Sequence, residues 1–197
     1  MKKEKSGNGF FVVMLIICAV LITLIVFGFI VFINREEEVI EKEENGASIV
    51  LNYTSNISGL RIKEATPTTD EVGEKNLNEE EYFDFSVEVS LDNASAVEYE
   101  ISLVKNQVNS NISNDDIKIY LEKEKSGTYT KVFGPDKFTP LKKNTKLGSK
   151  KGSMSLLSVR KTNSTADNYR LRVWLSDKST LDKGDYEVDV EVNGIAK

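Results

Sequence analysis

The chain has 197 residues, with 26 basic and 31 acidic side chains, one cysteine and no histidine. The absence of histidine excludes Ser-His-Asp and Cys-His catalytic sites and zinc sites built on imidazole. The net charge of −5 argues against a nucleic acid as the partner. The composition therefore points away from histidine-dependent hydrolases, proteins with imidazole-based zinc sites and nucleic-acid-binding proteins.

Residues 10–33 form an uncharged and almost wholly apolar run of 24 residues. A helix of this length measures about 36 Å, which is enough to cross a hydrocarbon core of about 30 Å. The run is longer than the apolar stretch of a cleaved signal peptide, and no small-x-small cleavage site follows it. The sequence therefore predicts a retained transmembrane signal anchor, with the lipid bilayer as the partner of this run.

The charges on the two sides of the apolar run predict its orientation. Residues 1–9 carry three lysines and one glutamate, whereas residues 34–47 carry six glutamates, one lysine and one arginine. Because lysine and arginine mark the cytoplasmic side, we expect residues 1–9 to form a cytoplasmic tail. We expect residues 34–47 to form an acidic juxtamembrane spacer and residues 48–197 an extracytoplasmic domain. The part beyond the tail has 23 basic and 30 acidic side chains, a net charge of −7.

An alternative interpretation is that the N-terminus is processed. A short basic leader ends at Gly9 and the apolar run opens at Phe10, an arrangement similar to that of type IV prepilins. That family has a glutamate at the fifth position after the cleavage point, where this chain has Met14. Under this interpretation the chain is a pilin-like or matrix-fibre subunit, released or assembled after N-terminal processing.

Downstream of the spacer, apolar and polar residues alternate with a period of two, between clusters of Gly, Pro, Asn, Asp and Ser. This part of the sequence predicts no convincing helix. The pattern predicts an all-β two-sheet sandwich of Ig-like or jelly-roll type, following one N-terminal transmembrane helix. The expected strands are 48–54, 58–64, 83–91, 97–105, 117–122, 127–133, 154–161, 168–176 and 185–193.

Charge matching suggests how the last two strands are paired. If 168–176 and 185–193 form a hairpin, one register makes one face wholly apolar and sets Arg172 opposite Asp189 on the other face. Opposite charges on neighbouring strands stabilise a pair by roughly 0.2–1 kcal/mol, and a slip of one residue would reverse the two faces. We therefore predict this hairpin.

The same argument separates an earlier pair of strands. A tight hairpin of 83–91 with 97–105 would set Glu88 directly opposite Glu100. Like charges that face each other across a strand pair are destabilising. We therefore expect these two strands to belong to different sheets.

Carboxylates are the groups that remain for catalysis or for cation binding. A glycosidase needs two of them across a cleft, and a calcium site needs several oxygens in one loop. We interpret the candidates as solvated groups on strand faces and turns, so the sequence predicts no enzyme, no cofactor and no metal site. The candidate carboxylates are Asp84, Glu88, Asp115, Asp116, Asp177, Asp182 and Asp185.

One segment departs from the acidic character of the chain, because residues 137–151 contain six lysines and no acid. We expect a flexible loop that could contact anionic wall polymers or lipid headgroups. The only tryptophan, Trp174, lies on the polar face of the predicted hairpin, where it could contact carbohydrate or protein, cover arginine stems or lie beneath a loop. The lysines that we consider candidate contacts are Lys142, Lys143, Lys146, Lys150 and Lys151.

Two stretches resemble strands of the secreted β-sandwich proteins of Firmicutes that are related to TasA and camelysin. They are residues 169–175, with the sequence YRLRVWL, and residues 82–87, with the sequence YFDFSV. The resemblance implies a jelly-roll-like domain that assembles into fibres of a biofilm matrix or coats the cell. Members of that family are expected to carry a cleavable signal, whereas this chain has a long anchor.

These observations predict a single-pass, membrane-anchored extracellular β-sandwich with a structural, adhesive or surface-binding role and no catalysis. Its expected partners, besides the bilayer, are an anionic wall polymer, a carbohydrate or other surface proteins. The excess of lysine over arginine and the abundance of asparagine suggest an AT-rich bacterium as the source.

Overall fold

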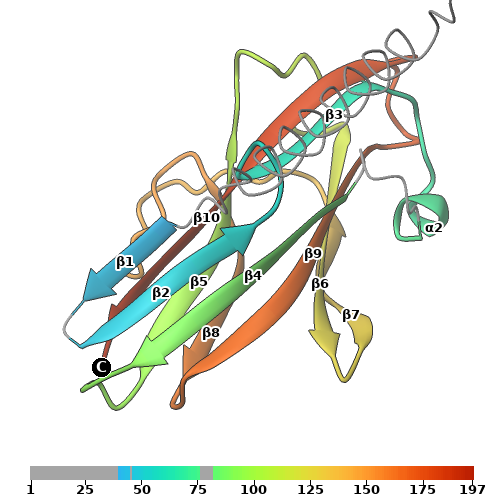
Figure 1. The fold of residues 1–197 in the computed structure, drawn as a ribbon. Coiled ribbons are helices and arrows are strands. Elements are labelled where there is room, and N and C mark those ends of the chain that lie inside the picture. Colours follow the sequence, from blue (N-terminus) through green and yellow to red (C-terminus); the bar gives the residue numbers. More distant parts are fainter. Residues whose placement is uncertain (1–39, 45, 76–81) are drawn as a thin grey trace, which may run out of the picture. The chain divides into compact units, whose positions relative to one another are not determined.

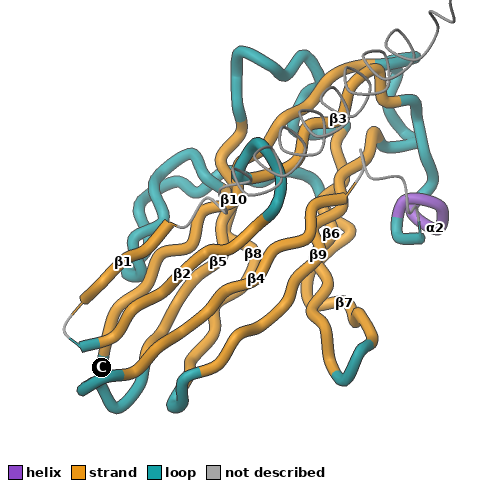
Figure 2. The backbone as a smooth tube through the Cα atoms, in the orientation of Figure 1, coloured by secondary structure: helices purple, strands orange, loops and turns teal. Residues whose placement is uncertain are grey.

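The computed structural model describes residues 40–44, 46–75 and 82–197, which form two antiparallel β-sheets (Figure 1). Strands make up most of this part, and its one short helix is α2 (Asp70–Gly73) (Figure 2). The predicted anchor at residues 10–33 lies outside the described residues. Within them, no helix has the length and apolar character needed to cross a membrane.

The larger sheet has six strands in the order β1-β2-β4-β9-β6-β7, and the smaller has four in the order β3-β10-β5-β8. All neighbouring strands within each sheet run antiparallel, which is consistent with the predicted sandwich. The strands of the larger sheet are β1 (Ile40–Glu44), β2 (Ala47–Tyr53), β4 (Tyr82–Leu91), β6 (Ile117–Lys125), β7 (Thr128–Asp136) and β9 (Thr165–Leu175). Those of the smaller sheet are β3 (Gly59–Ala65), β5 (Val97–Lys105), β8 (Met154–Lys161) and β10 (Gly184–Ala196).

The alternating sequence of each central strand places one face in a hydrophobic core that both sheets share. In β4, every second residue from Phe83 to Val89 is buried. The rings of Phe83 and Phe85 lie 5.6 Å apart, and Phe85 stacks on Tyr169 of β9 at 5.4 Å. Such aromatic pairs add about 0.5–1.5 kcal/mol each beyond the burial of their surface.

Each of the nine expected strands overlaps a strand of the structure, and the separation of 83–91 from 97–105 is confirmed. These two segments are β4 in the larger sheet and β5 in the smaller one. The strand that sequence analysis missed is β1, which falls in the predicted spacer and pairs with β2 from Ile40 opposite Leu51 to Glu44 opposite Ala47. An edge strand needs backbone pairing with one neighbour only, so a charged sequence is compatible with it.

The predicted hairpin of the last two strands is wrong. Strand β9 lies between β4 and β6, whereas β10 lies between β3 and β5 in the other sheet. Arg172 pairs with Glu122 of β6 at 3.0 Å, and Asp189 instead accepts a hydrogen bond from Ser58 at 3.2 Å. The two apolar faces that suggested a hairpin belong to one core shared by both sheets.

A polar cluster around Asp167 links the two sheets at the edge of this core. The Asp167 carboxylate of β9 lies 2.8 Å from the ammonium of Lys123 of β6 and 2.6 Å from that of Lys161 of β8. It also accepts a hydrogen bond from Tyr99 of β5 at 3.1 Å. Burial alone would raise the pKa of this carboxyl, but the two ammonium groups outweigh burial and lower it. The charged form of Asp167 therefore stabilises the contact between the sheets.

We expect Asp167→Asn to lower the free energy of unfolding by about 1–3 kcal/mol at pH 7, because two lysines lose their counter-charge. A carboxyl with a lowered pKa stabilises the fold above its unfolded-state pKa near 3.8, and this contribution is lost as the pH falls through the folded-state value. The difference between wild type and variant should therefore shrink below about pH 4. Urea unfolding of the full chain in neutral detergent, followed by Trp174 fluorescence, measures this.

The matched control is Asp92→Asn, which changes an exposed aspartate at a turn. It should alter stability by less than about 0.5 kcal/mol at either pH. Equal stability of Asp167→Asn and Asp92→Asn at pH 7 would contradict the proposed role of the cluster.

Candidate functional site

The segment that joins β7 to β8 carries the candidate lysines, and we call residues 137–153 the lysine loop. Its first lysine, Lys137, pairs with Asp115 at 2.5 Å. The other five are exposed and form no ion pair with the part of the chain that the structure describes. The loop therefore presents five uncompensated positive charges. They are Lys142, Lys143, Lys146, Lys150 and Lys151.

The lysine loop is tied together by its own backbone, contrary to the expectation of a flexible segment. Leu141 donates its amide hydrogen to the carbonyl of Ser153 at 2.7 Å, and Thr145 donates to the carbonyl of Ser149 at 2.8 Å. The amide of Lys151 donates to the side-chain oxygen of Asn144 at 2.8 Å. These bonds close two turns inside the loop and restrict the backbone that carries the lysines.

Glu100 of β5 fixes the loop to the outer face of the four-stranded sheet. Its neighbours Tyr99 and Ile101 point into the core, so the Glu100 side chain points to the opposite face. The Glu100 carboxylate accepts hydrogen bonds from the hydroxyls of Thr145 at 2.6 Å and Ser155 at 2.5 Å. Glu100 lies beneath the loop and is only 4% exposed to solvent. One buried carboxylate thus joins the middle of the loop to the sheet.

Hydrogen bonding keeps Glu100 charged in this buried position. Burial alone would raise the pKa of the carboxyl, but the nearby hydroxyl groups, among them those of Ser155 and Thr145, outweigh burial and lower it. On the same face, Gly148 of the loop lies so close to Asn193 of β10 that an added Cβ would be 3.3 Å from the asparagine Cβ. The loop therefore rests on both central strands of the smaller sheet.

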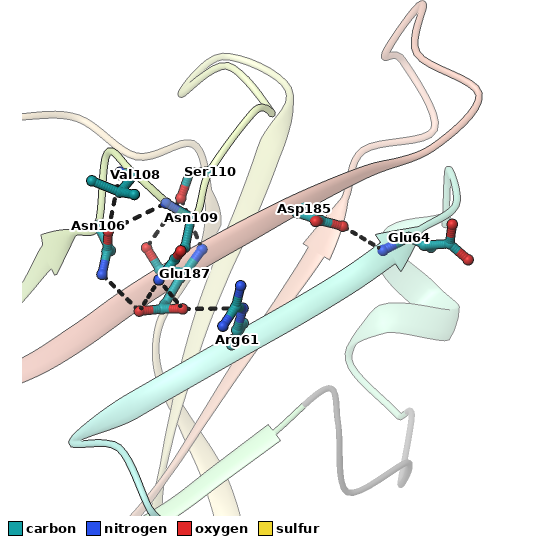
Figure 3. A network of polar contacts seen from close by, with 8 residues as sticks. All are labelled: Arg61, Glu64, Asn106, Val108, Asn109, Ser110, Asp185 and Glu187. Atoms are coloured by element: carbon teal, nitrogen blue, oxygen red, sulfur yellow. Dashed lines mark hydrogen bonds and ion pairs between the residues drawn. The ribbon is translucent and has the colours of Figure 1, made fainter.

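A second carboxylate, Glu187 of β10, holds the loop that follows β5 on the same face (Figure 3). It accepts hydrogen bonds from the side-chain amides of Asn106 at 2.7 Å and Asn109 at 3.0 Å. Its other partner is Arg61 of β3, at 3.2 Å. The loop carries the exposed Val108, but a single apolar side chain at a surface is ordinary. We therefore assign a structural role to the Glu187 network.

Trp174 is not at the surface, so it does not form a contact site together with the lysines. It is 4% exposed and lies on the outer face of β9, next to the Tyr120 ring at 6.3 Å. Helix α2 covers it closely, because a Cβ added to Gly73 would lie 2.3 Å from Cδ2 of the indole. Of the alternatives left open by the sequence, the structure shows a tryptophan beneath a covering segment.

Three of the carboxylates that the sequence singled out, Asp84, Asp115 and Asp185, bind other groups of the protein. Asp84 receives two hydrogen bonds of 2.7 Å from Arg170, whose guanidinium is stacked 4.5 Å from the centre of the Tyr82 ring. Asp185 accepts the amide of Glu64 at 2.7 Å. Across residues 40–44, 46–75 and 82–197, no group of three or more acidic or cysteine side chains could hold a metal ion.

The sequence identified the five exposed lysines but not the groups that fix them. Glu100 follows the alternating pattern of a solvent-facing residue in β5, so nothing in the sequence distinguishes it from the other acids on that strand. Its partners lie 45 and 55 positions away along the chain. Only the folded arrangement brings these hydroxyl groups to the carboxylate.

Comparison with known proteins gives little help with function. No protein-family model matches the chain, and no curated protein matches it. A solved structure that resembles it is that of AvmM, described by the words "AvmM Catalyzes Macrocyclization in Alchivemycin A Biosynthesis". The two chains are 11% identical over 80% of this chain and 96% of that one, with a TM-score of 0.31. A similarity this low carries no argument about activity.

We expect Glu100→Gln to loosen the lysine loop. A glutamine cannot accept both hydroxyl hydrogen bonds with the same strength, so stability should fall by about 1–3 kcal/mol. Hydrogen exchange at the amides of Thr145 and Lys151 should become faster, while exchange in β5 away from the site stays slow. Glu98→Gln, on the same face of the same strand, is the control and should leave the loop protected. Unchanged exchange in Glu100→Gln would contradict the clamp.

Gly73→Ala should uncover Trp174, because the added methyl has no space above the indole. Trp174 is the only tryptophan, so its emission should shift to longer wavelength and become more accessible to acrylamide. Val72→Ala, in the same helix at a position that is 55% exposed, is the control and should leave the emission unchanged. Identical spectra for the two variants would show that α2 does not cover the indole tightly.

Proposed function

We propose that the protein is a non-catalytic binding module, held at the outer cell surface by a single membrane anchor at residues 10–33. The anchor and its orientation rest on the apolar run and on the lysines before it. The module is a β-sandwich of Ig-like or jelly-roll type, and the two antiparallel sheets support this architecture. Its role is to bind an anionic component of the cell envelope.

The observation that carries this proposal is the fixed array of unpaired cations on an acidic protein. Five exposed lysines lie within ten residues of a loop that hydrogen bonds to a buried glutamate. Elsewhere in the described chain, many basic side chains are paired with acids, as in the contact of Arg172 with Glu122. A local cluster that is left uncompensated favours an anionic partner over a general role in solubility.

A second candidate is a subunit of a matrix fibre, produced by N-terminal processing. The two stretches that resemble TasA-like proteins, 82–87 and 169–175, lie on neighbouring strands β4 and β9. They are in direct register there, with Phe83 opposite Leu171. The intact mass of the membrane-extracted protein separates the candidates. Loss of residues 1–9 or of the whole apolar run would support the fibre subunit, and full mass supports the anchored module.

The binding role is tested by replacing the five lysines of the loop with glutamine in the full chain. We expect sedimentation with isolated, delipidated cell envelopes to fall to background for this variant, because the partner is recognised by charge. The control replaces five exposed lysines elsewhere with glutamine and so has the same net charge. These control positions are Lys63, Lys75, Lys125, Lys131 and Lys178.

The control protein should sediment as the wild type does. If both variants lose binding equally, net charge alone is responsible and the loop is not a site. If both bind as the wild type does, the lysine loop has no part in attachment.

A further inference from the structure

The chemistry of the lysine loop narrows the class of anion that it can recognise, and this step rests on the proposed function. The five cations are all lysines, and no arginine lies between residues 137 and 153. Lysine is a compact, strongly hydrated point charge, whereas planar bidentate recognition of a carboxylate is the speciality of arginine. The loop is therefore suited to separate tetrahedral anions rather than to paired carboxylate groups.

The loop also has no surface for stacking against sugar rings. Its one aromatic residue, Phe138, is 2% exposed and packs against Tyr186 in the core, with 6.5 Å between the ring centres. Trp174 is equally unavailable, because it is buried beneath α2. Recognition by this loop would therefore depend on charge and not on contact with a pyranose face.

The surroundings of the loop are unfavourable for a flat anionic surface. Asp189 and Glu191 of β10 lie on the same outer face of the smaller sheet and are partly exposed. A plane of lipid phosphates would meet these acids as well as the lysines, and like charges repel. A single flexible polymer strand can follow the loop and avoid them.

We propose that the lysine loop binds a linear polymer whose repeating units carry phosphate groups, as a free chain and not as a bilayer surface. The loop offers several point charges on a backbone that Glu100 holds in place. One strand would bind several ammonium groups at once, so binding would be multivalent. The contacts are exposed, so they would weaken steeply as salt shortens the screening length.

The test uses the full chain in neutral detergent and linear inorganic polyphosphate as the probe, with binding measured by calorimetry at low salt. The wild type should bind, and the variant with five loop lysines changed to glutamine should bind at least about 30-fold more weakly. Each exposed ion pair contributes a fraction of 1.4 kcal/mol, and every 1.4 kcal/mol of lost binding free energy weakens affinity about tenfold. The variant with five lysines changed elsewhere should keep most of the affinity. Equal losses in the two variants would overturn the proposal.

Two further probes separate the class of anion. Poly-L-glutamate of matched charge should bind at least about tenfold more weakly than polyphosphate, because its anions are carboxylates. Vesicles of phosphatidylglycerol should show no binding that depends on the loop lysines. Equal affinity for polyglutamate would overturn the assignment to phosphate, and lysine-dependent binding to vesicles would replace the polymer with the bilayer. Either result leaves the binding role itself intact if the envelope assay still depends on the lysines.

Glu100→Gln tests whether the fixed shape of the loop contributes to binding. This variant keeps all five lysines and gains positive charge overall, so a purely electrostatic effect would strengthen binding to polyphosphate. We expect weaker binding instead, because a released loop must be ordered again when the polymer binds. Thr145→Val, which removes one hydroxyl donor without changing charge, should weaken binding in the same direction. Affinity equal to or above that of the wild type in both variants would overturn the positioning role of Glu100.

Discussion

The shared core of the two sheets is the constraint on which the remaining features depend. Each central strand must give one face to this core, so its other residues are sent to an outer face whatever their charge. On the larger sheet those outer residues form local pairs, such as Arg170 with Asp84. On the smaller sheet they include Glu100 and Glu187, which accept hydrogen bonds from side chains of loops. The same alternation thus builds the core and places the carboxylates that hold the loops.

The alternation of apolar and polar residues predicted the positions of the strands and the face that each one buries, but not the order of the strands in the sheets. A period of two tells which face of a strand is buried, and it located nine strands. It does not tell which strand lies beside which, because an apolar face packs equally well in a hairpin or across a core. Charge matching could not decide either, since Arg172 had acids available on both β10 and β6 and the structure uses Glu122. The charged strand β1 was missed because its sequence lacks the alternation that identified the others.

The candidate site was likewise predictable only in part. The lysines could be recognised because they are adjacent in sequence, and the structure leaves the five in solvent. Their support could not be recognised, because it consists of hydrogen bonds between Glu100 and residues of a later loop and strand. For Trp174 the sequence placed the residue correctly on a polar face but did not predict its burial, because a distant segment folds over it. Exposure on an outer face therefore depends on covering loops, which alternation does not describe.

The buried Glu100 carboxylate reduces the conformational entropy that the lysine loop would lose when it binds a partner. Exposed lysines in a free segment would lose conformational entropy in ordering both the backbone and the side chains when a partner binds. In this loop the backbone turns are already closed by hydrogen bonds such as that from Leu141 to Ser153, so mainly the side chains remain to be ordered. The negative charge of Glu100 lies below the cations and is compensated by hydroxyl donors instead of by the lysines. The five lysines thus have no acid partner within the described residues, and the hydrogen bonds that hold the loop do not involve their ammonium groups.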